Sequence, residues 1–215
     1  MISHTDLEDL MRIAILGTGR VAQTLAAGLV GAGHDVVIGS RDPANRSGLP
    51  APVAASADVV VGADVVINAV QGVDTIPLLA SIGADTLDEI VLWDIANAAN
   101  PDFSPAIPDD SLGRRIQEAF PHVKVVKAAN NVAAVVVADP GTLPAPTTLF
   151  LSGDHTDAKE VVSGLLIDLG WPRDSLFDLG EIVNAYGQEH YLALFGTILH
   201  KLGTPYFNIA IVKAA

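Results

Sequence analysis

Residues 12–41 constrain the fold most, because they combine a short apolar run, a glycine-rich turn, a helical segment and a second apolar run. Arg12–Leu16 is rich in isoleucine and leucine, which is typical of a strand buried on both faces. Gly17-Thr18-Gly19 follows at once, and Ala22 completes the pattern G-x-G-x-x-A. This order of strand, glycine turn and helix predicts the first unit of an α/β protein with a doubly wound parallel Rossmann sheet.

Each small residue of the pattern has its own role. Gly17 permits the tight turn out of the strand, Gly19 lets a pyrophosphate approach the backbone, and Ala22 lets the helix expected at 21–30 lie close to the sheet. The start of that helix offers free N–H groups and the positive end of the helix dipole to phosphate groups. The pattern therefore predicts a dinucleotide site, and a glycine turn without any nucleotide is the alternative.

The residues after the second strand indicate which dinucleotide is bound. An NAD-binding chain usually places an acidic residue there for the ribose 2′-hydroxyl, whereas this chain has Ser40 and Arg41. A hydroxyl and a guanidinium suit a 2′-phosphate, which a carboxylate would repel. Arg46 is close enough to add positive charge, and Asp42 is interpreted as a turn residue before Pro43. The sequence thus predicts NADP, with a solvated loop cation as the alternative role of Arg41.

Composition excludes several classes of function. The formal charge of −13 argues against nucleic acid and anionic membranes as partners, and it makes Arg41 a local positive site on an acidic chain. The absence of cysteine excludes disulfides, thiol catalysis and cysteine-ligated metals. The beginning of the chain lacks the apolar core of a signal peptide, and Asp58 and Asp64 interrupt the longest apolar stretch. We therefore expect a cytoplasmic protein that acts on a small-molecule substrate.

The remaining pattern predicts three regions: an N-terminal extension at 1–10, an NADP-binding Rossmann domain at 11–153, and a smaller, mainly helical C-terminal region for substrate or dimerisation at 154–215. In the last region we expect a long helix at 181–202 and a final strand at 207–212. The helix carries more apolar surface than a solvated helix needs. We therefore predict a homodimer that uses part of it.

The ionisable side chains give no evident catalytic set. His34, His122, His190 and His200 are expected to have surface or packing roles, so no metal site is predicted. Lys127 is placed near the end of its strand, close to the expected nicotinamide edge. It either steers an anionic coenzyme, acts in acid–base chemistry, or simply reaches solvent.

The sequence from Arg12 to its end resembles the family of NADP oxidoreductases that depend on the deazaflavin coenzyme F420. The resemblance rests on GTG at 17–19, VVIGSR at 36–41, the strand end Ala69-Val70, KVVKAANNVAA at 124–134 and GTPYFNI at 203–209. It implies that Ser40 and Arg41 hold the 2′-phosphate of NADP. It also implies that the protein transfers a hydride between NADP(H) and a deazaflavin.

The same resemblance assigns the remaining site residues. Thr18, Arg20 and Val21 are expected along the pyrophosphate, and Ala69, Val70 and Gln71 on the nicotinamide side. The loop 130–134 is expected beneath the nicotinamide and facing the deazaflavin, which makes Asn130, Asn131 and Val132 the nicotinamide-side candidates. The full cofactor-binding set is Gly17, Thr18, Gly19, Arg20, Val21, Ser40, Arg41, Arg46, Ala69, Val70, Gln71 and Ala134.

Hydride transfer between two such rings needs little side-chain chemistry, because the cofactors carry the reactivity and the protein orients them. The catalytic residue therefore stays open, with Asn130, Asn131 or water as hydrogen-bond partners for the proton at the deazaflavin. Gln71 and Gly72 stand where the family often has proline and a bulky residue. The alternatives are a reductase of another small molecule or a metal chelate, and a sensor that binds NADPH without catalysis.

Overall fold

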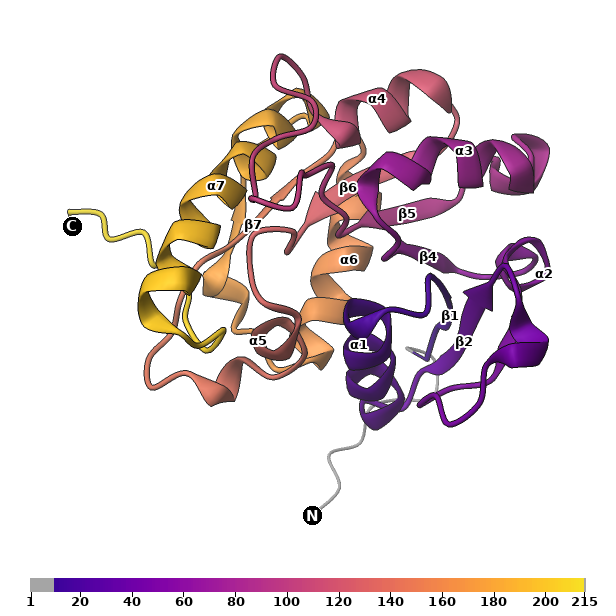
Figure 1. Cartoon of the computed structure of the whole chain (residues 1–215), viewed down its shortest axis with the longest axis horizontal. Helices are drawn as coiled ribbons and strands as arrows, with labels where there is room; N and C mark the ends of the chain where they lie inside the picture. Colours follow the sequence, from indigo (N-terminus) through magenta and orange to yellow (C-terminus); the bar gives the residue numbers. More distant parts are fainter. Residues whose placement is uncertain (1–9, 215) are drawn as a thin grey trace.

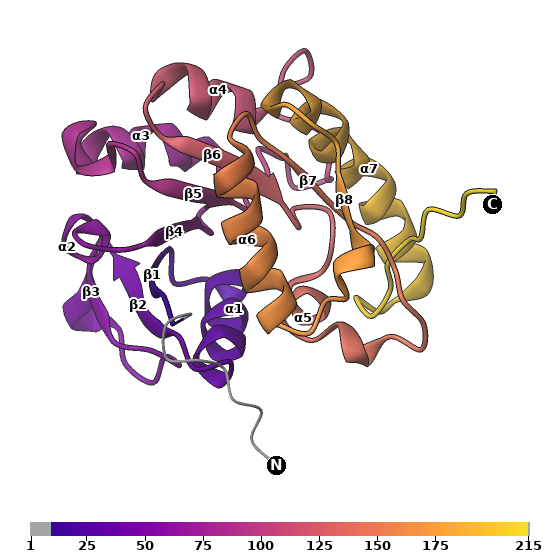
Figure 2. The same ribbon diagram turned by 180° about the vertical axis from the view of Figure 1, so that it is seen from behind.

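Eight strands form one sheet at the centre of the molecule, in the order β3-β2-β1-β4-β5-β6-β7-β8 (Figures 1 and 2). This computed structural model describes residues 10–214. The strands are β1 (Arg12–Leu16), β2 (Asp35–Ser40), β3 (Val53–Ala55), β4 (Val65–Asn68), β5 (Val91–Asp94), β6 (Lys124–Ala128), β7 (Leu149–Ser152) and β8 (Leu176–Asp178). The predicted doubly wound α/β architecture is confirmed.

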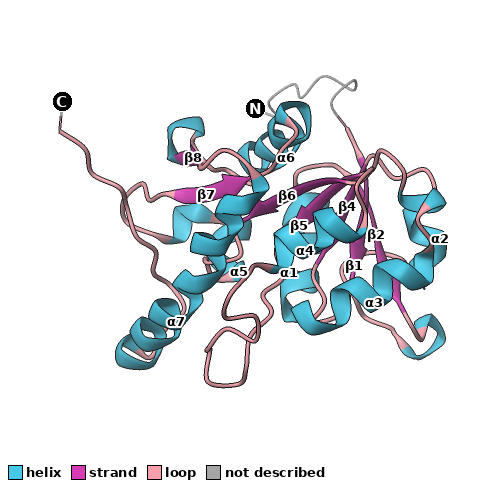
Figure 3. Cartoon of the chain, turned by 90° about the horizontal axis from the view of Figure 1, so that it is seen from above, coloured by secondary structure: helices cyan, strands magenta, loops and turns pink. Residues whose placement is uncertain are grey.

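Helices cover both faces of the sheet (Figure 3). One face packs against α1 (Arg20–Gly31), α5 (Ala134–Ala138) and α6 (Thr156–Asp168). The other face packs against α2 (Ser56–Val60), α3 (Gly72–Ile82), α4 (Leu112–Ala119) and the start of α7 (Ala185–Leu202). Two apolar cores therefore lie back to back, with the sheet between them.

The burial of β1 on both faces of the sheet explains why its sequence is a continuous apolar run. Ile13 and Ile15 point into one core, whereas Ala14 and Leu16 point into the other, as the alternation along a strand requires. All four are at most 1% exposed. Hydrogen bonds to β2 and β4 on either side place this strand, and the glycine turn that follows it, in the middle of the parallel part of the sheet.

The sheet departs from a purely parallel arrangement at one place, because β7 runs antiparallel to β6 while β8 runs parallel to β7. Parallel neighbours need a long crossover connection, usually a helix that spans the sheet. The connection from β6 to β7 holds the short helix α5, a 3-10 turn at Pro140–Thr142 and a proline-containing loop, but no helix that spans the sheet. The chain therefore returns into the sheet from the same edge, which the sequence did not predict.

The strand expected at 207–212 is wrong. This segment follows α7 after a left-handed glycine, Gly203, and adopts no strand conformation. It lies beside the beginning of β7, where the Thr148 N–H donates to the Ile209 carbonyl oxygen at 2.8 Å. Two side chains complete the attachment: Asn208 donates to the Thr148 carbonyl, and the Thr148 hydroxyl accepts from the Ile211 N–H.

The predicted regions and the predicted dimer stay predictions. Apart from Leu10, the extension at 1–10 lies outside the described residues. The sheet continues across the expected boundary at 153, because β7 and β8 pair directly. The apolar side chains of Leu194 and Leu202 on α7 are more than half exposed, at 53% and 54%. Within residues 10–214, no helix combines the length and apolar character needed to cross a bilayer.

Candidate functional site

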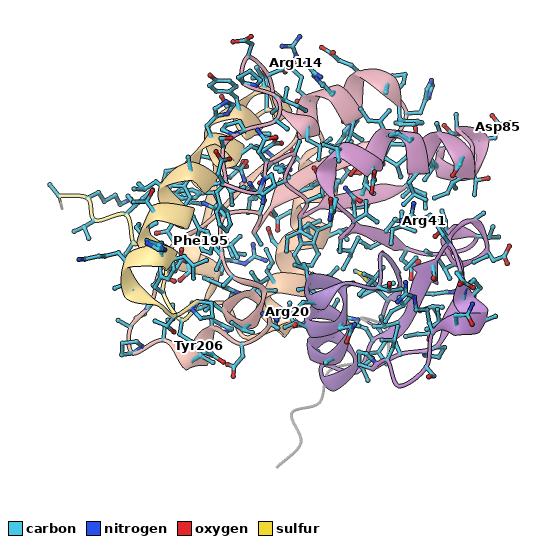
Figure 4. All side chains as sticks on the ribbon, viewed as in Figure 1. Arg20, Arg41, Asp85, Arg114, Phe195 and Tyr206 are labelled. Carbon is cyan, nitrogen blue, oxygen red and sulfur yellow. The ribbon has the colours of Figure 1, made fainter. Side chains whose placement is uncertain are left out.

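A pocket of about 670 Å³ opens where β1, β2 and β4 end, at the carboxyl edge of the sheet. Ligands bind at this edge in open parallel sheets. Figure 4 shows Arg41 between α3 and the strands β1 and β2. The pocket is lined by Gly17, Thr18, Gly19, Gly39, Ser40, Arg41, Asp42, Arg46, Ser56, Ala69, Val70, Gln71, Asp74, Pro77, Leu78 and Ser81. Nine of the predicted cofactor-binding residues are therefore brought together.

The two glycines of the turn have different surroundings. Gly17 has a φ of +117°, and a Cβ atom added there would lie 2.8 Å from the Ala69 carbonyl oxygen. Only glycine fits that backbone, and the fit holds the turn against the end of β4. Gly19 stands at the N-cap of α1, and an added Cβ atom would meet no atom within 4 Å. The space beside Gly19 is therefore open to a ligand.

The segment after β2 forms the basic side of the pocket. Ser40 is 5% exposed, and its hydroxyl accepts a hydrogen bond from the Asp42 N–H at 3.0 Å. Asp42 in turn accepts from the Asn45 amide at 2.7 Å, which confirms its interpretation as a turn residue. Arg41 and Arg46 are exposed, and neither forms a salt bridge with a carboxylate in residues 10–214. Both guanidinium groups are available to an anion.

The helix α3 forms a wall that the sequence reasoning missed. Asp74, Leu78 and Ser81 lie on one helical face because they are spaced by three and four residues, and Pro77 adjoins them. The sequence contained this signal: a helix that directly follows β4 must begin at the same sheet edge as the glycine turn. The other pocket residues that were missed are Gly39, Asp42 and Ser56, which adjoin predicted residues in the chain or in space.

The remaining predicted residues do not line this pocket. Arg20 and Val21 are exposed at the start of α1, and Figure 4 shows Arg20 on the side of α1 nearer to α5. Asn130, Asn131, Val132 and Ala134 follow β6, two strands beyond β4 along the same edge. The structure thus separates the predicted set into a phosphate-side pocket and a group farther along the carboxyl edge. Their roles as ligand contacts stay predictions.

The neighbouring residues Asn130 and Asn131 of this second group differ in their hydrogen bonding. Asn130 forms a reciprocal pair with Asn97, in which the Asn97 amide donates to the Asn130 carbonyl at 2.6 Å and the Asn130 amide donates to the Asn97 side chain at 2.9 Å. The Gln188 amide of α7 also donates to Asn130, at 3.4 Å. The amide of Asn131 is buried, and neither its nitrogen nor its oxygen has a hydrogen-bond partner in the described part of the chain.

The interpretation of Lys127 as a strand-end lysine that reaches solvent is wrong. Its side chain is fully buried, and its ammonium lies 2.8 Å from Asp94 and 3.0 Å from Glu189. The ammonium also donates to the Ala96 carbonyl oxygen at 2.5 Å. The residue is enclosed because β5 and β7 flank its strand and α7 supplies Glu189 from the far end of the chain. A lysine held by three acceptors is unavailable to steer a coenzyme from solution.

The buried cluster perturbs the pKa values of Lys127 and Asp94. Burial lowers the pKa of Lys127, but the carboxylates of Asp94 and Glu189 outweigh it, so that the pKa lies above its usual value. Burial raises the pKa of Asp94, and the neighbouring Lys127 ammonium offsets only part of this rise.

Further hydrogen bonds extend the buried cluster to neighbouring elements. The Asn68 amide donates to Asp94 at 2.7 Å, and Glu189 accepts from the N–H groups of Leu112 and Gly113 at 2.8 and 3.0 Å. The cluster therefore joins β4, β5, β6, α4 and α7.

No histidine of residues 10–214 lines the pocket. The ring of His34 is buried, 3.2 Å from a carboxylate oxygen of Asp168. Asp88, Glu89 and His122 form a cluster with metal-ligand spacing, but all three are exposed near the start of β6, at the opposite edge of the sheet. The Lys124 ammonium lies 3.4 Å from Glu89 and so competes for its carboxylate.

Comparison with known proteins identifies a matching family and several similar proteins. Residues 12–98 match the model of the family described as coenzyme F420-dependent NADP oxidoreductases. A solved candidate F420-dependent NADP-reductase from Arthrobacter sp. FB24 is 38% identical, with a TM-score of 0.86, over 94% of this chain and 100% of that one. Protein SMa0349 from Sinorhizobium meliloti is 29% identical, with a TM-score of 0.68, over 83% and 89% of the two chains.

A further relative is a much longer protein. The metalloreductase STEAP3 of Rattus norvegicus is 30% identical over 177 residues, which is 81% of this chain. The chain spans 35% of the length of that relative.

Proposed function

Because the chain belongs to the family of coenzyme F420-dependent NADP oxidoreductases, we propose that it transfers a hydride between NADP(H) and a deazaflavin coenzyme of the F420 type. Membership in this family makes the protein an NADP-dependent oxidoreductase. The observation that carries the NADP part of the proposal is the phosphate-side pocket. There the guanidinium groups of Arg41 and Arg46, which form no salt bridge within residues 10–214, and the buried Ser40 hydroxyl stand beside a glycine turn. Fixed donors of this kind match the charge and shape of a phosphorylated dinucleotide.

In this proposal the dinucleotide follows the carboxyl edge of the sheet. Its 2′-phosphate contacts Ser40 and Arg41, and its pyrophosphate lies beside Gly19, where the N–H groups at the start of α1 favour negative charge. The nicotinamide then extends past Ala69–Gln71 toward the loop after β6. The bound nicotinamide would donate or accept the hydride, and the protein contributes position and orientation, which account for much of the rate in such transfers.

The two glycines provide a matched test of the pocket. Gly17→Ala is expected to lower the melting midpoint by several degrees, because its φ of +117° is strained for alanine and the Cβ atom would clash with the Ala69 carbonyl. Gly19→Ala should keep the wild-type midpoint, since its Cβ atom enters open space, yet weaken NADPH binding by about tenfold or more by crowding the pyrophosphate. Thermal unfolding and calorimetry separate the two effects. Unchanged NADPH affinity in a folded Gly19→Ala would contradict the proposed phosphate position.

The decisive experiment for the second substrate is an absorbance assay. The purified protein is mixed with NADPH and oxidised F420, and loss of the deazaflavin absorbance band is followed. Turnover that requires both the protein and NADPH is expected, because the chain would hold both rings for direct transfer. Tight NADPH binding without loss of the band would refute the deazaflavin part of the proposal and favour a sensor or another substrate.

The similarity to a metalloreductase favours one second candidate, the reduction of a metal chelate. A parallel assay replaces F420 by a ferric chelate and follows NADPH oxidation. Activity there without activity toward F420 would assign the same pocket to this alternative reaction. The pocket and the family membership are common to both candidates, so only the second substrate distinguishes them.

A further inference from the structure

Asn131 is an exception among the buried polar groups. The residue is 2% exposed, and within residues 10–214 neither atom of its amide has a hydrogen-bond partner. Buried amides are nearly always hydrogen-bonded, because leaving a donor and an acceptor unpaired costs free energy. The adjacent Asn130, in the same loop, satisfies this rule fully. The unpaired amide therefore requires an explanation.

The loop that carries Asn131 is strained and firmly held. Ala129, which precedes the two asparagines, has a φ of +61°, a backbone conformation that residues other than glycine rarely adopt. Ala129 is fully buried, and the preceding Ala128 carbonyl accepts from the Trp93 indole at 3.0 Å. Strained backbone that the surrounding structure maintains is characteristic of ligand-binding segments.

Hydrogen bonds connect this loop to the end of β4. The Gly72 N–H, directly after Gln71, donates to the Asn97 carbonyl oxygen at 3.2 Å, and Asn97 pairs with Asn130. Asn131 thus lies on the carboxyl edge of the sheet, on the side of Gln71 away from Arg41. A dinucleotide with its 2′-phosphate at Arg41 and its pyrophosphate at Gly19 directs its nicotinamide toward this loop.

The unpaired groups suit one kind of ligand. An asparagine amide presents one acceptor oxygen and one donor nitrogen side by side, and a primary carboxamide presents the same pair in a form that can face it in reverse. Two N–H···O bonds then form together, which no phosphate, carboxylate or cation can reproduce. We propose that Asn131 recognises the carboxamide of the nicotinamide ring. Since the amide is out of contact with solvent in the free protein, the pairing requires its side chain or the groups covering it to shift.

This inference rests on the proposed binding of NADP, so the test compares two ligands that share the phosphate-side contacts. NADPH carries the nicotinamide, whereas adenosine 2′,5′-bisphosphate lacks it. Asn131→Leu is expected to weaken NADPH binding by about tenfold, because the carboxamide loses both hydrogen bonds. Its affinity for the bisphosphate should equal that of the wild type. Calorimetry measures both affinities, and Asn131→Ala serves if the larger leucine prevents folding.

Asn130→Leu is the matched control for stability. It removes the two hydrogen bonds of the side-chain amide, to Asn97 and from Gln188, and is expected to lower the melting midpoint by about 4 °C or more. Asn131→Leu removes none within the protein and should melt at or above the wild-type midpoint. An equal loss of midpoint in both variants would overturn the inference, because it would show that the Asn131 amide is structural.

The outcomes separate the inference from its premise. A wild-type protein that binds neither ligand refutes the proposed NADP site itself. A wild type that binds both, with an Asn131→Leu variant that binds NADPH equally well, refutes only the role of Asn131. Selective loss of NADPH affinity in a stable Asn131→Leu supports the inference.

Discussion

Lys127→Met is expected to lower the free energy of unfolding by about 3–5 kcal/mol, because it leaves two buried carboxylates without their cation. The Asp94 and Glu189 carboxylates lie 2.8 and 3.0 Å from the lysine ammonium, and all three side chains are at least nine-tenths buried. Methionine preserves most of the side-chain volume, so the loss reports charge rather than a cavity. For a chain of this length the melting midpoint should fall by about 10 °C.

Lys124→Met provides the matched control, since it makes the same substitution on the same strand. Lys124 pairs with Glu89 and Asp157 at the surface, where water screens the interaction, and its loss should change the midpoint little. Similar losses in the two variants would contradict the role assigned to the buried cluster. Differential scanning calorimetry measures both.

The deficit of Lys127→Met should also depend on pH. Burial raises the pKa of the Asp94 carboxyl, and removing the ammonium removes the strongest opposing influence. An acid whose pKa is higher in the folded than in the unfolded state takes up a proton on folding, so its penalty is largest above the folded pKa and shrinks as the pH falls. Denaturant unfolding of the variant at pH 8 and pH 5 should therefore show a smaller deficit at pH 5. A deficit that is equal at both values would exclude an ionised carboxylate as its cause.

Arg41→Ala is expected to weaken NADPH binding by about 10- to 100-fold, because charge-assisted hydrogen bonds to the 2′-phosphate are lost. NADH lacks that phosphate, so its affinity should change by much less. Arg173→Ala is a suitable control, since this exposed arginine pairs with Glu160 away from the pocket. Calorimetry with both nucleotides and all three proteins measures the selectivity. Equal losses for NADPH and NADH would show that Arg41 does not read the phosphate.

Local patterns sufficed for the parts of the fold that neighbouring residues determine. The apolar run of β1, the G-x-G-x-x-A turn and the serine–arginine pair predicted both the α/β architecture and most of the phosphate-side pocket. Asp42 forms the predicted turn through its own neighbours. Each of these features depends on contacts within a few residues or on a strand period that the sequence displays directly.

Contacts between distant segments escaped prediction. The burial of Lys127 depends on Glu189, which is 62 positions later, and nothing in the strand sequence indicates that α7 covers it. The antiparallel direction of β7 depends on the path of a connection, not on its composition. The difference between Asn130 and Asn131 arises from partners on Asn97 and Gln188, so two identical residues in sequence have opposite environments.

The hydrogen bonds of the Glu189 carboxylate affect how the protein unfolds. Two of the N–H groups that open α4 find their acceptor on the final helix, although the segments are 76 and 77 positions apart. Dissociation of α7 would remove the Glu189 acceptor from the start of α4 and would expose the buried Lys127 at the same time. The C-terminal helix α7 therefore stabilises α4, and we expect both helices to unfold from the sheet in one cooperative step rather than in succession.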